Sequence, residues 1–351
     1  MPGFPLILAG CRIVFGDYVF PVRCVLAILG TIGCGCVYIV GRDLVNSTVG
    51  LWSCAAVSLS PPLVVFSPLL LTEATFATAL VASLIPIMRL FRRSPPDPLP
   101  ATARCVLSIA CGCAIAIATY IRPTWLPAAG VVALGIIALA ATQRARWIEA
   151  GLILASCGLL LAPWTYRNYV VCGHVVPTTL WVGPSLYDGL NLAATGDSDM
   201  TFFDQENLLA TMSEYDMDRE YRRRAWEFVR QHPRRTVELA LIKAGRYWSP
   251  WPNAAQFDRI WLQLGLTATT LPLYGLAIVG LWQRRNDWLF WTVTLGPAAF
   301  FCVVHMLFVG SIRYRLPADA PLAIAAATGA FELWRRWFPA SDGERMSPWA
   351  S

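Results

Sequence analysis

The stretch WIEAGLILASCGLLLAPWTYRNY, residues 147–169, decides the fold class. Its apolar run is long enough to cross roughly 30 Å of hydrocarbon as a helix. Similar runs recur along the 351 residues, of which 56% are hydrophobic and only 14% are charged. Because soluble domains average about 25% charged residues, the composition indicates that lipid is the solvent. We therefore predict an all-α polytopic membrane protein.

Apolar runs bounded by charged residues, proline or glycine predict about nine spans, at residues 21–40, 49–66, 70–91, 102–121, 125–142, 147–165, 258–281, 287–310 and 315–338. Residues 3–15 are too short to span comfortably, so we expect them to lie at the interface or to re-enter the membrane. The predicted units are N-terminal membrane helices (1–165), an external loop (166–257), C-terminal membrane helices (258–338) and a cytoplasmic tail (339–351).

Arginines in alternating loops predict the orientation. One set comprises Arg42, Arg89, Arg92, Arg93, Arg104, Arg144, Arg146, Arg284, Arg285, Arg335 and Arg336. The positive-inside rule places this set in the cytoplasm. The N-terminus then lies outside, the C-terminus inside, and residues 166–257 form one large external loop. The net charge of +6 is explained by these topology signals rather than by binding to nucleic acid.

The external loop is expected to contain short helices. Residues 213–230 are charged and helix-prone, and Pro233 is expected to start a second helix. Val237, Leu241, Ala244 and Trp248 follow at helical spacing in that second helix. Such an apolar stripe suits a helix that lies on the membrane surface, and it equally suits a helix packed on the rest of the loop.

Ionisable residues at membrane depth are functional candidates because burying them in lipid is costly. Glu73 begins a predicted span; it either interacts with the helix dipole or faces a cavity shared with substrate. Arg313 and Arg315 flank Tyr314 at the external end of the last span, and Asp319 follows between two prolines. The two arginines suit either lipid headgroups or a phosphate, whose oxygens a guanidinium contacts in pairs.

Further polar residues are expected on the same external side. Arg122 lies in a tight turn between two spans, and His305 lies in the outer half of its span. His305 suits either a hydrogen bond to a neighbouring helix or a place in the site. In PWTYRNY, Trp164 and Tyr169 suit interfacial anchoring, whereas Arg167 suits the rim of a site.

Several functions lack support in the sequence. No P-loop, G-x-G-x-x-G, G-x-S-x-G or H-E-x-x-H pattern is present. The eleven cysteines include G-C-G-C and C-G-C runs, which act as small residues at helix contacts. Their spacing is not that of zinc ligands. No dense cluster of Asp, Glu and His indicates a metal.

Five blocks in order resemble the GT-C glycosyltransferases of the family 39 type, which include protein O-mannosyltransferases and aminoarabinose lipid A transferases. They are PGFPLILAGCRIVFGD (2–17), LSPPLVVFSPLLLTEATF (59–76), APWTYRNYVVCGHVVPTT (162–179), the helix pair ending in YWSPWP (247–252) and RYRLPADAPL (313–322).

The resemblance implies transfer of a sugar from a polyprenyl-phosphate donor to a lipid, glycan or protein acceptor. The protein would lie among the lipids of a bacterial plasma membrane, and the transfer would take place on its external side. It implies phosphate contacts for Arg313, Arg315 and Arg167, and places for Tyr314 and Tyr166 beside the lipid head or sugar. Glu73 matches the T-E of the family and would line the cavity. Members of the superfamily differ in their need for a divalent ion.

The sequence departs from the family at its start. The family has a first helix and an acidic first external loop before the block that here begins at residue 2. A fragment or wrongly assigned start, a degenerate non-catalytic member, and a branch with a relocated base all remain open. For a relocated base, the acids to test are Glu73, Asp188 and Asp319. A non-catalytic lipid-handling, flippase-like or scaffold protein is the alternative function.

Overall fold

The computed structural model describes residues 1–92, 100–139, 142–252 and 259–338. The described residues form helices and no strand, which confirms the all-α prediction. The helices are α1 (Gly3–Phe15), α2 (Val19–Leu44), α3 (Ser47–Ser58), α4 (Pro61–Phe66), α5 (Thr72–Phe91), α6 (Ala101–Ile121), η1 (Pro123–Trp125), α7 (Pro127–Leu139), α8 (Arg144–Cys172), α9 (Val182–Gly189), α10 (Thr201–Glu206), η2 (Leu208–Ala210), α11 (Glu214–Gln231), α12 (Pro233–Trp248), α13 (Ile260–Gln283), α14 (Trp288–Thr294), α15 (Gly296–Leu307) and α16 (Ile312–Trp337). Arg93 and the predicted tail 339–351 lie outside the described residues.

Fewer helices than predicted have the length and apolarity of a membrane span. Within the described ranges there are five, namely α2, α5, α6, α8 and α13, or six if the pair α14 and α15, bent by 52°, counts as one span. The predicted span 49–66 is divided where Pro61 begins α4, because proline cannot continue the helix before it. The predicted span 315–338 lies in α16, whose first two turns carry Arg313, Arg315 and Asp319.

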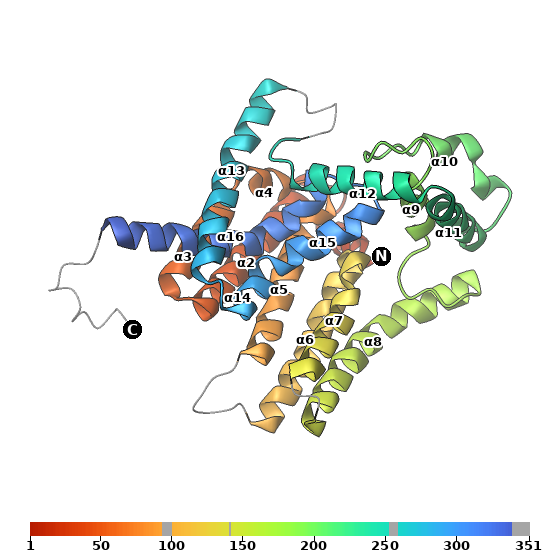
Figure 1. Cartoon of the computed structure of the whole chain (residues 1–351). Coiled ribbons are helices and arrows are strands. Elements are labelled where there is room, and N and C mark those ends of the chain that lie inside the picture. The colour runs from red at the N-terminus through yellow and green to blue at the C-terminus, as the bar shows by residue number, and fades with distance from the viewer. Residues whose placement is uncertain (93–99, 140–141, 253–258, 339–351) are drawn as a thin grey trace.

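The helix α16 forms the centre of the membrane part (Figure 1). Its residues from Arg315 to Gly329 are buried, and it packs against α3, α5, α13 and α15. The crossing with α13 is close, because a Cβ atom at Gly280 would overlap the carbonyl oxygen of Ala325. A Cβ atom at Gly329 would likewise overlap the carbonyl oxygen of Leu276. Small residues of this kind let helix backbones approach in membranes.

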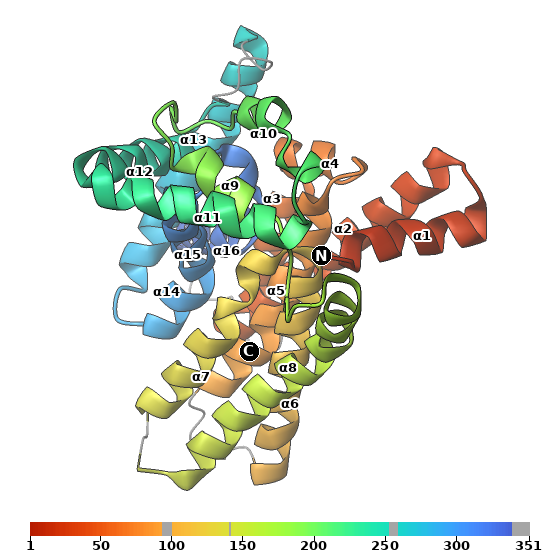
Figure 2. The same cartoon turned by 90° about the vertical axis from the view of Figure 1, so that its right-hand side faces the viewer.

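The first two helices lie to one side. In Figure 2, α1 and the start of α2 project away from the remaining helices. Large apolar side chains on this pair are exposed, among them Ile13 and Phe20. Residues 3–15, predicted to be too short to span, form the single short helix α1. Extensive exposed apolar surface of this kind marks contact with lipid or with another protein.

The long helix α8 contains the whole of PWTYRNY, residues 163–169. Its 29 residues extend about 43 Å at 1.5 Å per residue, which exceeds the roughly 30 Å of hydrocarbon. The helix runs through the predicted boundary at residue 165 and ends at Cys172. Trp164 Nε1 donates to the carbonyl of Thr178 at 2.7 Å, and Asn168 Nδ2 donates to that of Val176 at 2.9 Å. These two side chains therefore hold the segment that leaves the helix.

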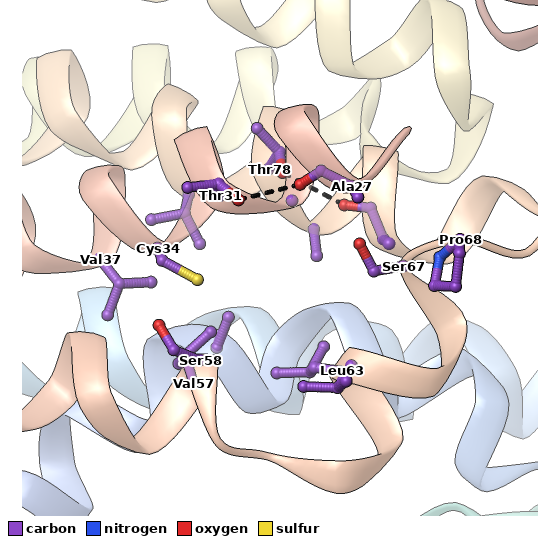
Figure 3. Close-up of a pocket in the computed structure, with 17 residues that line it drawn as sticks. Ala27, Thr31, Cys34, Val37, Val57, Ser58, Leu63, Ser67, Pro68 and Thr78 are labelled. Atoms are coloured by element: carbon purple, nitrogen blue, oxygen red, sulfur yellow. Dashed lines mark hydrogen bonds between the residues drawn. The ribbon is translucent and has the colours of Figure 1, made fainter. Parts of the chain in front are cut away.

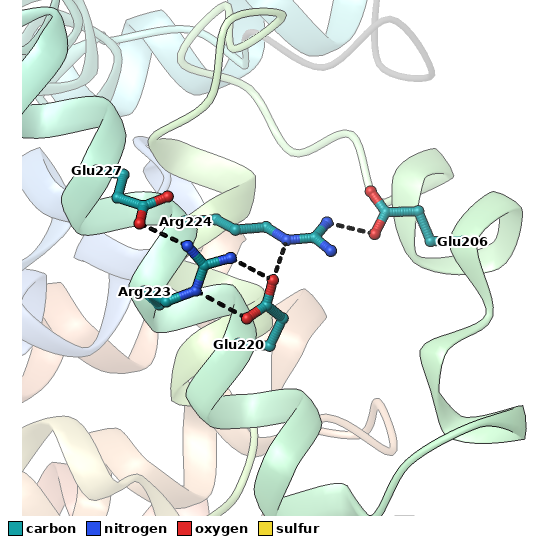
Figure 4. Close-up of polar contacts among 5 residues, drawn as sticks. All are labelled: Glu206, Glu220, Arg223, Arg224 and Glu227. Atoms are coloured by element: carbon teal, nitrogen blue, oxygen red, sulfur yellow. Dashed lines mark hydrogen bonds and ion pairs between the residues drawn. The ribbon is translucent and has the colours of Figure 1, made fainter.

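The helices α9 to α12 gather at one end of the molecule (Figure 1). Their shared apolar core consists of Leu186, Leu190, Ala194, Ala225, Phe228 and Leu239. The predicted helix at 213–230 is confirmed as α11, and the Ser213 hydroxyl accepts from the backbone N–H of Asp216 as an N-cap. Arg223 and Arg224 pair with Glu206, Glu220 and Glu227 on the outer face (Figure 4).

The helix α12 starts at Pro233, as predicted. Val237 and Leu241 of the predicted apolar stripe are exposed. Leu239, Lys243 and Tyr247 lie four residues apart and are buried, and α12 packs against α11, α15 and α16. The helix therefore packs on its neighbours through one side and leaves an apolar stripe free on another.

Candidate functional site

Glu73 lies at the first turn of α5 and is fully buried. Its Oε1 pairs with Arg122 Nη2 at 2.7 Å and also with Arg313. Arg122 Nε donates in addition to the hydroxyl of Thr72 at 3.0 Å. Glu73 Oε2 is buried and has no hydrogen-bond partner within the described structure. One carboxylate therefore gathers two guanidinium groups, from the end of α6 and the start of α16.

Tyr314 and His305 extend this group. Their rings stack with centroids 4.2 Å apart and planes 12° apart. The His305 Nδ1 lies 3.0 Å from the carbonyl oxygen of Val309. The Arg122 guanidinium lies 5.9 Å from the centroid of the Tyr314 ring, within the range of a cation–π contact. The structure thus brings together Glu73, Arg122, His305, Arg313 and Tyr314, which we call the Glu73 cluster.

The two arginines of the cluster differ in access. The Arg122 side chain is 14% exposed, whereas that of Arg313 is 46% exposed. Two guanidinium groups face one carboxylate, so the ion group carries an excess of positive charge. Arg313 is consequently the member that an incoming anion can reach.

Arg315 and Asp319 lie elsewhere on α16. Arg315 Nε pairs with Asp319 Oδ1 at 3.0 Å. Arg315 Nη1 donates to the carbonyls of Tyr247 at 3.0 Å and Ser249 at 2.8 Å. These bonds attach the end of α12 to α16. The sequence analysis gave Arg315 and Arg313 the same role in binding phosphate. Residues two positions apart on a helix point in directions that differ by about 200°, so the two side chains contact different neighbours.

Arg167 and Tyr166 are exposed at the end of α8, and their contacts are local. Arg167 Nη1 donates to Asn168 Oδ1 at 3.2 Å, and its guanidinium lies 5.1 Å from the Trp164 ring centroid. Their predicted contact with phosphate or sugar stays a prediction.

Asp188 lies in α9 and is buried. Its carboxylate accepts from the Ser198 hydroxyl at 2.7 Å and from the Asp199 N–H at 2.8 Å. Burial raises the pKa of Asp188, an effect that those two hydrogen bonds partly offset. These contacts order the loop after α9.

Lys243 of α12 is a buried charge that the sequence did not single out. Its Nζ donates to the carbonyls of Met306 at 3.3 Å and Leu307 at 3.0 Å, at the end of α15. Burial lowers the pKa of Lys243 to about 8, and nearby Asp188 opposes this shift. A signal was present in the sequence, because Lys243 is four residues from both Leu239 and Tyr247 on the buried side.

Two cavities lie among the membrane helices. The first, of about 390 Å³, is lined by α2, α3, α4 and α5 and by Ala320 of α16; we call it the α2–α5 cavity (Figure 3). It includes Ala74 and Ala77, so it lies beside Glu73 on α5. The second, of about 450 Å³, is lined by α3, α4, α13 and α16; we call it the α13–α16 cavity. Both have the size of ligand pockets.

A metal site was not predicted from the sequence. The described ranges contain no group of three or more His, Cys, Asp and Glu side chains that could hold a metal ion. The eleven cysteines are free.

The family model described as dolichyl-phosphate-mannose-protein mannosyltransferase matches residues 1–166. This match covers 166 of the 351 residues, slightly less than half of the chain. The mannosyltransferase family is one of membrane glycosyltransferases of the GT-C type, and the chain is an integral membrane protein. The predicted resemblance is therefore confirmed. The match includes Glu73 and Arg122 and ends before Arg167. No curated protein matches the sequence.

Two solved structures with TM-scores above 0.5 share the fold. The oligosaccharyltransferase of Archaeoglobus fulgidus, tethered with an acceptor peptide containing the NVT sequon, has a TM-score of 0.55 at 14% identity. The archaeal oligosaccharyltransferase AglB from the same organism, in complex with an inhibitory peptide and a dolichol-phosphate, has a TM-score of 0.53 at 12% identity. The alignments cover 97% of this chain but only 42% and 44% of those chains. ArnT from Cupriavidus metallidurans, in the apo state, has a TM-score of 0.40 at 14% identity, covering 94% of this chain and 67% of that one.

Proposed function

We propose that the protein transfers a sugar from a polyprenyl-phosphate donor to an acceptor on the external side of the plasma membrane. The observation that supports this most is the half-exposed Arg313, held beside Arg122 by Glu73. The topology predicted from the arginines puts this cluster on the outer side. The family match and the AglB complex with a dolichol-phosphate are consistent with such a donor.

The chemistry requires positive charge at the leaving group. When an acceptor attacks the anomeric carbon, the bond from that carbon to the phosphate oxygen breaks, and negative charge develops on the departing polyprenyl phosphate. A guanidinium placed there stabilises the transition state more than the ground state. Arg313 is the reachable cation, and Arg122 adds charge from behind. Glu73 Oε1 pairs with both arginines, so we assign Glu73 the role of orienting them.

The α2–α5 cavity would hold the first isoprene units of the donor. Its wall is apolar, with Val37, Val57 and Leu63 around an open space and with Ser67 and Thr78 as hydroxyl-bearing residues at the edge (Figure 3). It adjoins Ala74, next to Glu73 in α5. A chain in this cavity would place its phosphate close to the Glu73 cluster, and its burial would contribute about 0.8 kcal/mol per CH₂ group.

Transfer from a labelled donor tests the proposal. The purified protein in nanodiscs, made with a membrane lipid extract as the acceptor source, is given a radiolabelled polyprenyl-phosphate hexose. We expect the label to leave the donor, and Arg313→Ala to slow this strongly. Donor that binds but stays intact contradicts the proposed transfer. If, in that case, vesicles carrying the protein move the donor between leaflets, the lipid-handling alternative replaces it.

A further inference from the structure

The two cavities share a wall. Val57 at the end of α3 and Leu63 in α4 line both of them. The α4 helix has only six residues and is bounded by Ser60 and Ser67. The α2–α5 cavity and the α13–α16 cavity therefore lie on two sides of the same short segment.

The helix α16 also separates them. Asp319 lines the α13–α16 cavity, and its neighbour Ala320 lines the α2–α5 cavity. Both residues lie about 10 Å along the helix from Arg313, at 1.5 Å per residue. Both cavities therefore reach α16 less than two turns below Arg313. Two apolar chains bound there would have their heads near the same cluster.

The α13–α16 cavity has its own chemistry. Its wall is formed mainly by Ala, Pro and Leu side chains, with Thr269 and Thr270 in addition. Asp319 is the one charged residue among those that line it, because its partner Arg315 does not. Arg315 offsets the charge of this carboxylate from outside the cavity, at 3.0 Å. The carboxylate oxygens can still accept from a hydroxyl or ammonium group, whereas they offer no donor to a phosphate. The cavity therefore suits an amphiphile with a donor head better than it suits polyprenyl phosphate.

We propose that the α13–α16 cavity binds the apolar chain of a lipid acceptor whose head carries a hydroxyl or ammonium group. This inference rests on the proposed glycosyl transfer and selects a lipid over a protein or a soluble glycan as acceptor. A protein acceptor needs a chain cavity for the donor alone, whereas two lipid substrates need two such cavities. The presence of two cavities near the Glu73 cluster therefore favours two lipid substrates, a donor and an acceptor.

Photolabelling in nanodiscs tests the assignment. The probes are a diacylglycerol and a sphingosine, each with a diazirine in its chain, and phosphatidic acid with the same diazirine. The first two separate a hydroxyl head from an ammonium head, and the third carries a phosphate. We expect saturable labelling of α13 and α16 by at least one of the first two and none by phosphatidic acid. Labelling spread evenly over all lipid-facing helices, or phosphatidic acid labelling as strong as the others, overturns the proposal.

The variants are placed at exposed positions, so that a change in labelling does not reflect misfolding of the protein. Ala268 lines the α13–α16 cavity and is exposed, so Ala268→Trp fills the cavity from its edge. Ala110 of α6 is exposed and lines neither cavity, so Ala110→Trp is the matched control. We expect Ala268→Trp to weaken the labelling about tenfold, the equivalent of about 1.4 kcal/mol. Labelling that survives Ala268→Trp unchanged overturns the proposal.

Polyprenyl phosphate binding separates this inference from the proposed function. Ala27→Trp, at an exposed position of the α2–α5 cavity, is expected to weaken that binding, and Ala268→Trp is expected to leave it unchanged. If Ala268→Trp weakens polyprenyl phosphate binding, the cavity belongs to the donor and the acceptor assignment fails. If the unmodified protein does not bind polyprenyl phosphate, the proposed function fails, and the acceptor assignment fails with it even where the labelling is saturable.

Discussion

Lys243 of α12 and Leu307 of α15 are joined by a hydrogen bond of 3.0 Å from Nζ to the carbonyl oxygen. The last carbonyls of a helix have no partner within that helix, and Lys243 supplies one for two of them. A Cβ atom at Gly310 would overlap the backbone of Lys243, so α12 also lies directly on the segment that precedes α16. The outer helices thus hold the segment from which Arg313 and Tyr314 emerge.

Replacing Lys243 with methionine is expected to loosen this contact. The side chain keeps nearly the same length, but the carbonyls of Met306 and Leu307 lose their donor. An unpaired buried carbonyl costs about 1–3 kcal/mol, and Arg313 loses part of its positioning. We expect a lower melting temperature in detergent together with weaker polyprenyl phosphate binding. Trp226→Ala, at an exposed residue of α11, is the control and is expected to change neither property.

The pH dependence of stability should reveal the lowered pKa of Lys243. Its pKa falls from an ordinary value of 10.5 to about 8 in the folded chain. Between these values the unfolded chain binds the proton and the folded chain does not, so the free energy of unfolding rises with pH in this window. Asp188 and His305 are the titratable groups that face it. Melting curves from pH 8 to 10.5 should show a rise that Lys243→Met lacks, and parallel curves would contradict the assignment.

Arg313 and Arg315 are predicted to separate into a binding and a folding role. Hydrogen bonds to charged groups contribute about 1.5–3 kcal/mol, so Arg313→Ala should weaken polyprenyl phosphate binding about tenfold or more with little change in melting temperature. Arg313→Lys should restore part of the binding, because lysine lacks the forked contact. Arg315→Ala should instead lower the melting temperature, since it leaves Asp319 and two carbonyls unpaired. Equal effects of Arg313→Ala and Arg315→Ala on binding would contradict this division.

Helix geometry alone could have separated Arg313 from Arg315, because residues two apart point to different sides of a helix. The meeting of Glu73 with Arg313 could not be predicted in this way. They are 240 residues apart, and their contact depends on how α5 and α16 pack. The apolar helix was expected to end at residue 165, within PWTYRNY, but α8 continues through this motif to Cys172. The carbonyls that Trp164 and Asn168 bind lie in an irregular segment, whose path the pattern of residues does not determine.

Glu73→Gln tests the anchor of the cluster. The amide keeps the shape of the side chain but removes the negative charge between two guanidinium groups. Breaking a buried pair by removing one charge costs about 3–5 kcal/mol, and Arg122 is the more deeply buried cation. We expect a clear fall in melting temperature, a loss of transfer and weaker binding of polyprenyl phosphate, because Arg313 is no longer held in place. A variant that binds polyprenyl phosphate at least as tightly as the unmodified protein would show that Glu73 competes with the phosphate rather than positioning Arg313 for it.

The crossing of α13 and α16 offers a test of the fold with its own control. A methyl group at Gly280 would overlap the Ala325 carbonyl, whereas one at Gly275 of the same helix meets nothing within 4 Å. Overpacking of this kind costs about 1–3 kcal/mol, so Gly280→Ala should lower the melting temperature by several degrees. Gly275→Ala should leave it unchanged or raise it slightly, because alanine favours a helix by about 0.5–1 kcal/mol over glycine. Identical melting curves for the two variants would mean that the helices do not cross at Gly280.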